Sequence, residues 1–507
     1  MGSASALSRR GFLKHTAVLT VSGTLTRVQV SRAQGGRDPA ELTAVAALRA
    51  MQAGELTAER YAEALLARCR ACSALNAFTS QDPEALLLTA RVADQRRASG
   101  AVLGPLHGLP VVLKDNIDTV VFPTTGGTVA LKDNIPPQNA PVAQRLFDAG
   151  ALLAGKTSLH ELAFGITNNN AAFGPVRNPY HPSMIPGGSS GGTAAAIAAR
   201  LSPVGLGSDT GGSSRIPAAL CGIVGLRPTL GRYSGAGIVP ISATRDTAGP
   251  MGRSVEDVAL LDSILTGGPL NIAPAALRGV RLGVPRAYFY DRLDPQVARV
   301  TEAALSVLSK LGAQLVEADI PHLADLNGQV SFPVALFEVM RDLPRYLATS
   351  APGVSLAEVI AQVASPDVAA VLHGQLGDQK VPEAVYRAAI DTHRPALQAA
   401  YQAYFREHGV AALVFPTTPL PARPIGHDTT VQLHDQEVPT FLIYIRNTDP
   451  ASNAGLPGLS VPIGLTTDGL PVGLEFDGPV GSDRLVLELG YALEKSLGML
   501  PPPPKCV

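Results

Sequence analysis

Short apolar runs alternate with longer amphipathic segments, and this alternation constrains the fold more than any other feature of the sequence. The apolar runs have the length of buried strands, whereas apolar residues three or four apart indicate helices. We expect strands at 109–113, 151–154 and 204–206, and helices at 44–52, 58–70, 83–99, 140–149 and 193–200. Strands and helices that alternate in this way form a sheet covered by helices. The sequence therefore predicts an α/β fold.

The pattern changes in the second half of the chain. From 286 to about 410 it is mostly helical, from 414 short strands and turns return, and 482–497 is typical of a final helix. Thr43, Thr57 and Asn139 precede predicted helices and have side chains that suit an N-cap. We find no internal repeat and no linker that would split the chain.

Composition excludes several classes of protein. Of the 507 residues, 46% are apolar and 16% are charged, which is typical of a globular protein. The net charge of −1, with no long run of one sign, argues against a nucleic-acid partner, which would need a basic stripe. Because the sequence lacks a stretch of about 20 apolar residues, we expect no membrane-spanning helix.

The amino terminus has the pattern of an export signal. Arg9 and Arg10 are followed by a modest apolar stretch at 17–25 and by Ser31-Arg32-Ala33, with small residues at the two positions that a signal peptidase reads. We interpret 1–33 as a twin-arginine signal peptide and 34–507 as the functional domain, and we expect a periplasmic protein. An ordinary basic amphipathic start is the alternative.

Four cysteines occur, and two of them, Cys69 and Cys72, form a C-x-x-C pattern. A zinc site would need a second pair or suitably spaced histidines, and a redox site would sit at a strand-to-helix turn. We interpret Cys69 and Cys72 as residues at a helix end. Cys221 begins an apolar run and is predicted to be part of the core.

Two common motifs match the sequence without the context they need. Residues 150–157 fit the P-loop pattern G-x-x-x-x-G-K-[ST], but their middle four residues are themselves a predicted strand rather than a flexible turn. Residues 187–191 fit G-x-S-x-G, the nucleophile elbow of α/β-hydrolases. That mechanism needs a downstream histidine, and none of the downstream histidines lies in a recognisable loop signature. ATP binding and a Ser-His-Asp mechanism remain the weaker alternatives.

Three segments taken together carry a stronger signal. The first is 111–118, with Lys114 at the end of an apolar strand; the second is Pro186-Gly-Gly-Ser-Ser-Gly-Gly-Thr193; the third is Gly207-Ser-Asp-Thr-Gly-Gly-Ser-Ser-Arg215. Both glycine clusters lie between apolar elements, where a flexible linker is improbable. The alternative for Lys114 is that it ends a strand and forms an ion pair with Asp115 or Asp118.

These segments, at their spacing along the chain, resemble the amidase signature family. The resemblance covers most of the mature chain, including 104–110, 155–165, 173–179, 416–419 and 452–457. It implies an α/β fold with a single large mixed β-sheet that helices cover on both faces. It also implies an amide hydrolase that needs no metal and no other cofactor.

The resemblance further implies the roles of individual residues. Ser213 would be the nucleophile that forms the acyl-enzyme, Ser189, joined to Gly188 by a cis peptide bond, would relay its proton, and a neutral Lys114 would be the final base. A free lysine has a pKa near 10.4, so the base must be desolvated, and the apolar strand before Lys114 suits this. The backbone N–H groups of Thr210, Gly211, Gly212 and Ser213 would form the oxyanion hole. Asp209 and Arg215 would brace the loop, and Ser190 would form a local hydrogen bond.

Residues 232–250 look most like mandelamide and indoleacetamide hydrolases, which suggests a small aryl-containing amide as substrate. The partner would then be this small molecule, with no nucleic acid and no membrane, and the protein would be a monomer or homodimer. Three alternatives stay open: an esterase or urethanase, the glutaminase subunit of a tRNA-dependent amidotransferase, and a catalytically silent binding protein on the same scaffold.

Overall fold

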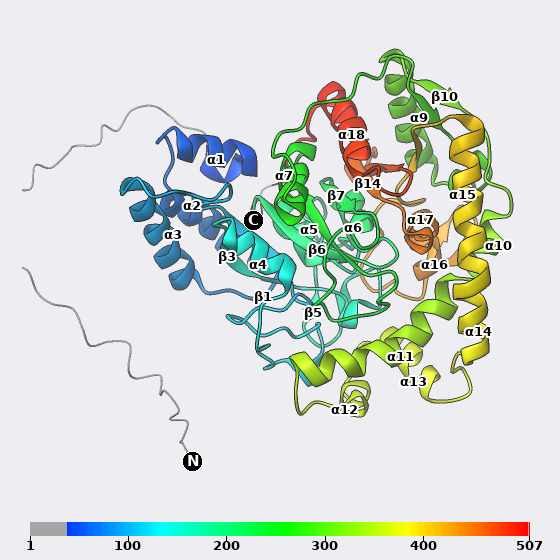
Figure 1. Ribbon diagram of the computed structural model, residues 1–507, viewed down its shortest axis with the longest axis horizontal. Helices are drawn as coiled ribbons and strands as arrows, with labels where there is room; N and C mark the ends of the chain where they lie inside the picture. Colours follow the sequence, from blue (N-terminus) through cyan, green and yellow to red (C-terminus); the bar gives the residue numbers. More distant parts are fainter. Residues whose placement is uncertain (1–37, 505, 507) are drawn as a thin grey trace, which may run out of the picture. The chain divides into compact units, whose positions relative to one another are not determined.

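A computed structural model describes residues 38–504 and residue 506, and these residues form one compact unit. The predicted signal peptide, 1–33, lies outside the described residues. At the centre of the described unit is an eleven-stranded mixed sheet (Figure 1). In sheet order the strands are β1 (Phe78–Ser80), β3 (Leu152–Thr157), β2 (Pro110–Lys114), β6 (Val204–Asp209), β8 (Thr247–Gly252), β7 (Val224–Arg227), β14 (Gly458–Leu465), β15 (Pro471–Asp477), β11 (Ala412–Pro416), β9 (Arg281–Gly283) and β10 (Gln314–Val316).

Helices cover both faces of this sheet, which confirms the predicted α/β class. One face packs against α1 (Ala44–Gln52), α2 (Ala58–Ala71), α3 (Pro83–Ala98), α4 (Pro141–Asp148), α7 (Val255–Thr266), α9 (Pro295–Lys310) and α18 (Asp483–Leu497). The other face packs against α5 (Gly191–Ala198), α6 (Arg215–Cys221), α15 (Arg394–His408) and α17 (Asp449–Ala454). Strand β11 shows the division: Ala412 and Val414 pack with α9, whereas Leu413 and Phe415 pack with α15.

The remaining α-helices, with one exception, lie in the stretch from 286 to about 410 that was predicted to be mostly helical. They are α8 (Arg286–Phe289), α10 (Leu323–Gly328), α11 (Ser331–Ser350), α12 (Leu356–Ala361), α13 (Pro366–Leu376) and α14 (Glu383–Ala388). The exception is α16 (Thr440–Ile445). Figure 1 shows α11, α12, α13 and α14 gathered at one end of the described unit. Two short hairpins, β4 (Asn169–Asn170) with β5 (Gly174–Pro175) and β12 (Thr430–Leu433) with β13 (Gln436–Pro439), lie outside the main sheet.

Strand topology brings two of the predicted site segments together. Strands β2 and β6 are parallel neighbours, with Leu113 opposite Leu206. Their carboxyl ends therefore lie at the same edge of the sheet, where open α/β sheets bind ligands. Lys114 ends β2 and Asp209 ends β6.

Helix starts agree with the sequence prediction in part. The Thr43 and Thr57 side chains cap α1 and α2 as predicted. The prediction for Asn139 is wrong: α4 has Ala140 as its N-cap and no side-chain cap, because Asn139 accepts the N–H of Val120 and donates to Gln144. Helix α5 begins at Gly191, two residues before the predicted start, inside the glycine cluster.

The cysteines are placed as predicted, with one addition. Cys69 lies in α2, Cys72 is its C-cap, and Cys221 is buried in the core. Cys72 forms a disulfide with Cys506, 434 residues away in sequence. The sequence analysis did not predict this pairing.

Candidate active site

Lys114, the last residue of β2, is completely buried. Its Nζ is 2.7 Å from Ser189 Oγ and 2.8 Å from Ser208 Oγ. Asn116 donates a hydrogen bond to the same Ser208 oxygen at 2.9 Å. Two hydroxyl groups therefore face the lysine amine, and one of them belongs to the predicted relay serine.

Burial lowers the pKa of Lys114 to about 7, although the charges of Asp209 and Asp246 act in the opposite direction. A substantial fraction of the side chain is then neutral near neutral pH. The alternative that Lys114 pairs with Asp115 or Asp118 is wrong. Asp115 pairs with Lys156 at 3.1 Å, and Asp118 accepts a hydrogen bond from Tyr346 at 2.6 Å.

The two glycine segments, which carry Ser189 and Ser213, contact each other. Ser189 is completely buried and follows a cis peptide bond with Gly188. The N–H of Ser190 donates to the carbonyl oxygen of Ser213 at 3.1 Å, which holds the segments together beside the lysine. Among the hydrogen bonds of the described residues, none joins the hydroxyl groups of Ser189 and Ser213. The Ser190 hydroxyl bonds to the backbone of Ser208, the local role predicted for it.

We call residues 210–213 the oxyanion loop. The prediction that all four of their N–H groups form the oxyanion hole is wrong for one of them. The N–H of Gly212 donates to Asp209 Oδ1 at 2.9 Å, so it is not free to bind an oxyanion. In the described residues, no hydrogen bond uses the N–H of Gly211 or Ser213. These two groups, with Thr210, remain as candidate donors.

Each of these two free N–H groups belongs to a peptide unit whose carbonyl is held. The carbonyl of Thr210, in the same planar unit as the Gly211 N–H, accepts from Arg245 at 3.3 Å and from Arg227 at 3.4 Å. The carbonyl of Gly212, in the unit of the Ser213 N–H, accepts from the Ile216 N–H at 2.8 Å. Because C=O and N–H point in opposite directions across a trans peptide, a fixed carbonyl also fixes the direction of the N–H.

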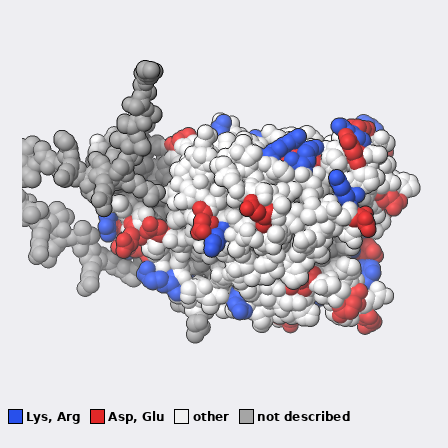
Figure 2. Space-filling view, turned by 90° about the horizontal axis from the view of Figure 1, so that it is seen from below, with Lys and Arg blue, Asp and Glu red and all other residues white. Residues whose placement is uncertain are grey.

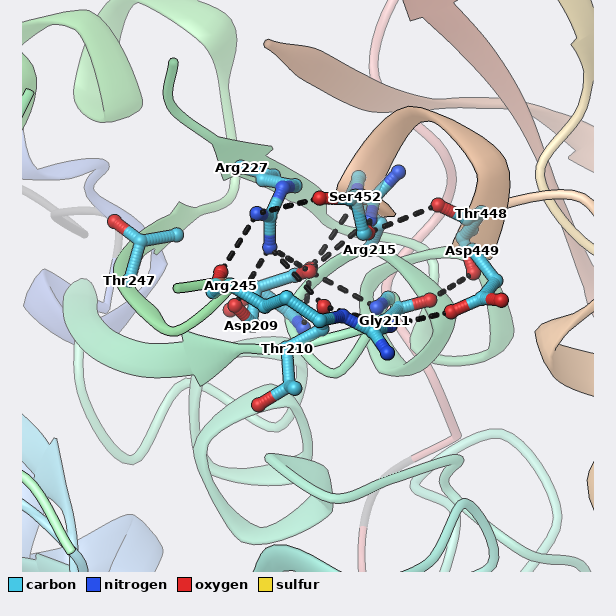
Figure 3. Close-up of polar contacts among 12 residues, drawn as sticks. Asp209, Thr210, Gly211, Arg215, Arg227, Arg245, Thr247, Thr448, Asp449 and Ser452 are labelled. Carbon is cyan, nitrogen blue, oxygen red and sulfur yellow. Dashed lines mark hydrogen bonds and ion pairs between the residues drawn. The ribbon is translucent and has the colours of Figure 1, made fainter. Parts of the chain in front are cut away.

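Asp209 and Arg215 brace this loop, as predicted, together with Arg227 (Figure 3). Asp209 also accepts the N–H of Ser214, and Arg215 reaches Glu475 at 2.8 Å. Burial alone would raise the pKa of Asp209, but the charges of Arg215 and Arg227 lower it below its ordinary value. Asp209 is therefore a charged anchor for the loop.

A cavity of about 180 Å³ opens in front of Ser213. Apolar residues form most of its wall. Thr210, Gly211 and Ser213 of the oxyanion loop also line the cavity, together with Arg245 and Asp449. The apolar wall consists of Ala163, Phe164, Ile166, Ile241, Phe332, Ala335, Leu336, Val371, Phe441 and Ile445, while Asp367 and Asp428 are further polar lining residues. A cavity of roughly 150 Å³ accommodates benzene, so this one has room for an aromatic ring with a short side chain.

The two weaker motif interpretations do not fit the site. Lys156 of the P-loop-like segment lies in β3, buried and paired with Asp115, rather than in a phosphate-binding turn. The Ser189 hydroxyl bonds to a lysine and not to a histidine. Within 38–504 and 506, no cluster of three or more His, Cys, Asp or Glu side chains is arranged to hold a metal ion. Over the same residues, no helix has the length and apolarity to cross a membrane.

Sequence reasoning missed Ser208, Asn116, Arg227 and Arg245 as parts of the site. Ser208 and Asn116 lie inside the segments that were singled out, and their polar character at the ends of buried strands was an available signal. Arg227 lies outside the segments that were singled out, and Arg245 lies in 232–250, which was considered only for the substrate; nothing local in the sequence connects either arginine to the oxyanion loop.

The chain is similar in sequence to known proteins. The amidase family model matches residues 60–487. An indoleacetamide hydrolase of Agrobacterium vitis is 50% identical over 86% of this chain and 92% of its own length. A mandelamide hydrolase of Pseudomonas putida is 42% identical over 91% of this chain and 93% of its own length.

The fold is also similar to that of a solved structure. The crystal structure of native peptide amidase from Stenotrophomonas maltophilia superimposes with a TM-score of 0.79 at 32% identity, covering 92% of this chain and 99% of that chain. The family model, the relatives and the fold lead to the same conclusion, that this chain belongs to the amidase signature family.

Proposed function

We propose that this protein, an amide hydrolase by family, hydrolyses small amides that carry an aromatic group, through an acyl-enzyme formed on Ser213. The observation that carries the proposal is the buried hydrogen bond between Lys114 and Ser189, beside a cavity that Ser213 lines. The names of the hydrolases described above and the apolar wall of the cavity support the aromatic group.

In the proposed acylation step, Ser213 Oγ attacks the amide carbonyl carbon. Its proton passes to Ser189, whose own proton passes to the neutral amine of Lys114. The negative charge that develops on the carbonyl oxygen is stabilised by the N–H groups of Gly211 and Ser213, and one such donor is typically worth about 3–4 kcal/mol in the transition state.

The C–N bond then breaks, and the proton held by Lys114 returns through Ser189 to the leaving nitrogen. The products of this half-reaction are ammonia or an amine and an ester of Ser213. Water attacks this ester with Lys114 again as base, which releases the carboxylic acid and restores the free enzyme. All the proton transfers use groups of this chain.

A substrate screen tests the proposed function. The purified protein is assayed with phenylacetamide, acetamide, an anilide, methyl phenylacetate, a carbamate and glutamine. We expect the highest kcat/KM among amides for phenylacetamide. A clear preference for the ester or the carbamate would indicate an esterase or urethanase, and one for glutamine would indicate a glutaminase subunit. No turnover of any compound would indicate a binding protein.

A pair of variants links the preference to the cavity. Phe441 lines the cavity, and its ring centroid is 6.0 Å from that of Phe332, whereas its neighbour Leu442 is exposed and does not line it. Phe441→Ala should reduce the ratio of kcat/KM for phenylacetamide to that for acetamide by about tenfold, since lost apolar contact weakens binding of the ring. Leu442→Ala should leave the ratio unchanged.

We also propose export by the twin-arginine route. The pattern at 8–33 supports it, and so does the Cys72–Cys506 disulfide, because stable disulfides occur mainly in oxidising compartments. Arg9→Lys with Arg10→Lys should leave unprocessed protein in the cytoplasm, whereas the unaltered protein should be trimmed near Gln34. Export and trimming of the double variant would refute this proposal.

On the face seen in Figure 2, acidic and basic side chains are scattered with no broad basic area, in line with a small-molecule substrate.

A further inference from the structure

Arg245 holds the oxyanion loop from the side of the substrate cavity. It lies just before β8, and its buried guanidinium contacts three different parts of the chain. Nη2 donates to the carbonyl of Thr210 at 3.3 Å and to Asp449 Oδ1 at 2.5 Å, and Nη1 donates to the carbonyl of Ser331 at 2.9 Å. Figure 3 shows Arg245 reaching across the oxyanion loop toward Asp449.

Asp449 gives this arginine a fixed partner. Both side chains are buried, and the second carboxylate oxygen of Asp449 accepts from Asn327 at 2.9 Å and from Asn453 at 3.0 Å. A buried guanidinium that is held at both terminal nitrogens, by a carboxylate and by backbone carbonyl oxygens, has little freedom to rotate. The Arg245–Asp449 pair is therefore a rigid element next to the loop.

The pair contacts the oxyanion loop directly. A Cβ atom placed on Gly211 would be 3.0 Å from Asp449 Oδ1 and 3.3 Å from Arg245 Nη2. Asp246, which follows Arg245 in the chain, accepts a hydrogen bond from the Thr210 hydroxyl at 2.6 Å. Two consecutive residues thus hold Thr210, one by its carbonyl and the other by its side chain.

From these contacts we propose that Arg245 is a positioning residue for catalysis. By holding the Thr210 carbonyl it fixes the plane of the Thr210–Gly211 peptide, and this directs the Gly211 N–H toward the oxyanion. The inference rests on the proposed function, because it gives the Gly211 N–H a role in the transition state. A donor that is rotated out of line weakens transition-state binding more than substrate binding.

The test is Arg245→Met, which keeps an unbranched side chain in place of the aliphatic stem and removes the guanidinium donors. We expect kcat for phenylacetamide to fall at least tenfold and KM to change less than threefold. Benzylboronic acid, which forms a tetrahedral adduct with a nucleophilic serine, should lose affinity by the same factor as kcat/KM. 2-Phenylethanol, which fills the aryl cavity but presents no carbonyl oxygen, should bind as before. The matched control is Arg232→Met, which removes another arginine–aspartate ion pair, with Asp262, and should leave kcat unchanged.

Three outcomes would overturn the inference. Normal kcat in Arg245→Met would show that the loop is positioned without Arg245. Equal losses of affinity for benzylboronic acid and 2-phenylethanol, with a lower unfolding temperature, would show a structural role. If Arg245→Met does not fold, Asp449→Asn, which weakens the hold on Arg245 by removing the charge of its partner, should show the same split between the two inhibitors, and equal losses would again overturn it. A failure of the proposed function is distinguishable, since the unaltered protein would then neither hydrolyse phenylacetamide nor bind benzylboronic acid.

Discussion

Lys114 is buried, and in the described part of the chain its side chain makes hydrogen bonds to serine hydroxyls and no ion pair. Burial is the main cause of its low pKa, and the charges of Asp209 and Asp246 limit the shift. A base at the end of a serine relay must be neutral to accept a proton, and burial among uncharged partners favours the neutral form. The same environment would not serve a lysine whose role was to hold a carboxylate.

The pH dependence of the reaction should follow this lysine. Since only the deprotonated amine accepts the relayed proton, kcat/KM should rise about tenfold per pH unit below about 7 and level off above it. Lys114→Ala and Lys114→Arg should both lose at least about 10³-fold in kcat, because a guanidinium is effectively never deprotonated. The measurement is kcat/KM for phenylacetamide between roughly pH 5 and 10, with the exposed Lys132→Arg as control. Near-normal activity of Lys114→Arg would show that the positive charge, and not the neutral base, is needed.

Much of the site could be predicted at the residue scale, because its parts are concentrated in three short segments. Lys114, Ser189 and Ser213 were predicted as the catalytic residues, and the structure brings Lys114 and Ser189 into direct contact. The use of the Gly212 N–H by Asp209 could not be predicted, because it depends on the turn that the loop makes after β6. Arg245 was missed for a similar reason: its partners lie in α11, α17 and the oxyanion loop, which are distant in sequence.

Among the elements, the oxyanion loop requires glycine at position 212. Gly212 has φ of +137°, a conformation that favours glycine, and a Cβ atom there would overlap Thr448 Oγ1. Thr448 donates to the carbonyl of Gly211 at 2.6 Å, so it cannot move away without releasing the loop.

Gly212→Ala should therefore displace the loop and lower kcat by about 10²–10³-fold, the effect of losing one oxyanion donor. Gly235→Ala is the control, since a Cβ atom on Gly235 would meet nothing within 4 Å. The measurement is kcat at saturating phenylacetamide, together with the unfolding temperature of both variants. Equal kcat in Gly212→Ala and the unaltered protein would show that this part of the loop does not contribute to the transition state.

Element types were more predictable than element ends. The strand before Lys114 and the helices at 44–52 and 483–497 follow from periodicity and length alone. Helix α5 starts earlier than predicted because Gly191 and Gly192 are helical despite their low helix propensity. Side chains at these positions would collide with Asn168 and with the backbone of Ser158, so close packing determines the residue type there.

For the whole molecule, the disulfide between Cys72 and Cys506 ties the C-terminal tail to the end of α2. The pairing could not be predicted, because sequence does not specify which cysteines meet in the folded chain. A cross-link between such distant residues restricts the unfolded chain strongly.

Cys506→Ser should lower the free energy of unfolding by about 2–5 kcal/mol, the usual contribution of a native disulfide. Cys69→Ser is the control, because Cys69 is a free thiol on the same helix. Chemical unfolding without reductant measures the effect, and kcat should not change, since the hydrogen bonds of the Lys114 side chain involve neither cysteine. Equal stability of Cys506→Ser and the unaltered protein would show that the cross-link does not form.

The claim on which the whole account depends is that Ser213 forms the acyl-enzyme. The most direct measurement is labelling with a fluorophosphonate, followed by mass spectrometry of the digested protein. The account predicts one modified residue, Ser213, with labelling lost in Ser213→Ala and retained in Ser190→Ala. Labelling that persists in Ser213→Ala and disappears in Ser190→Ala would contradict it.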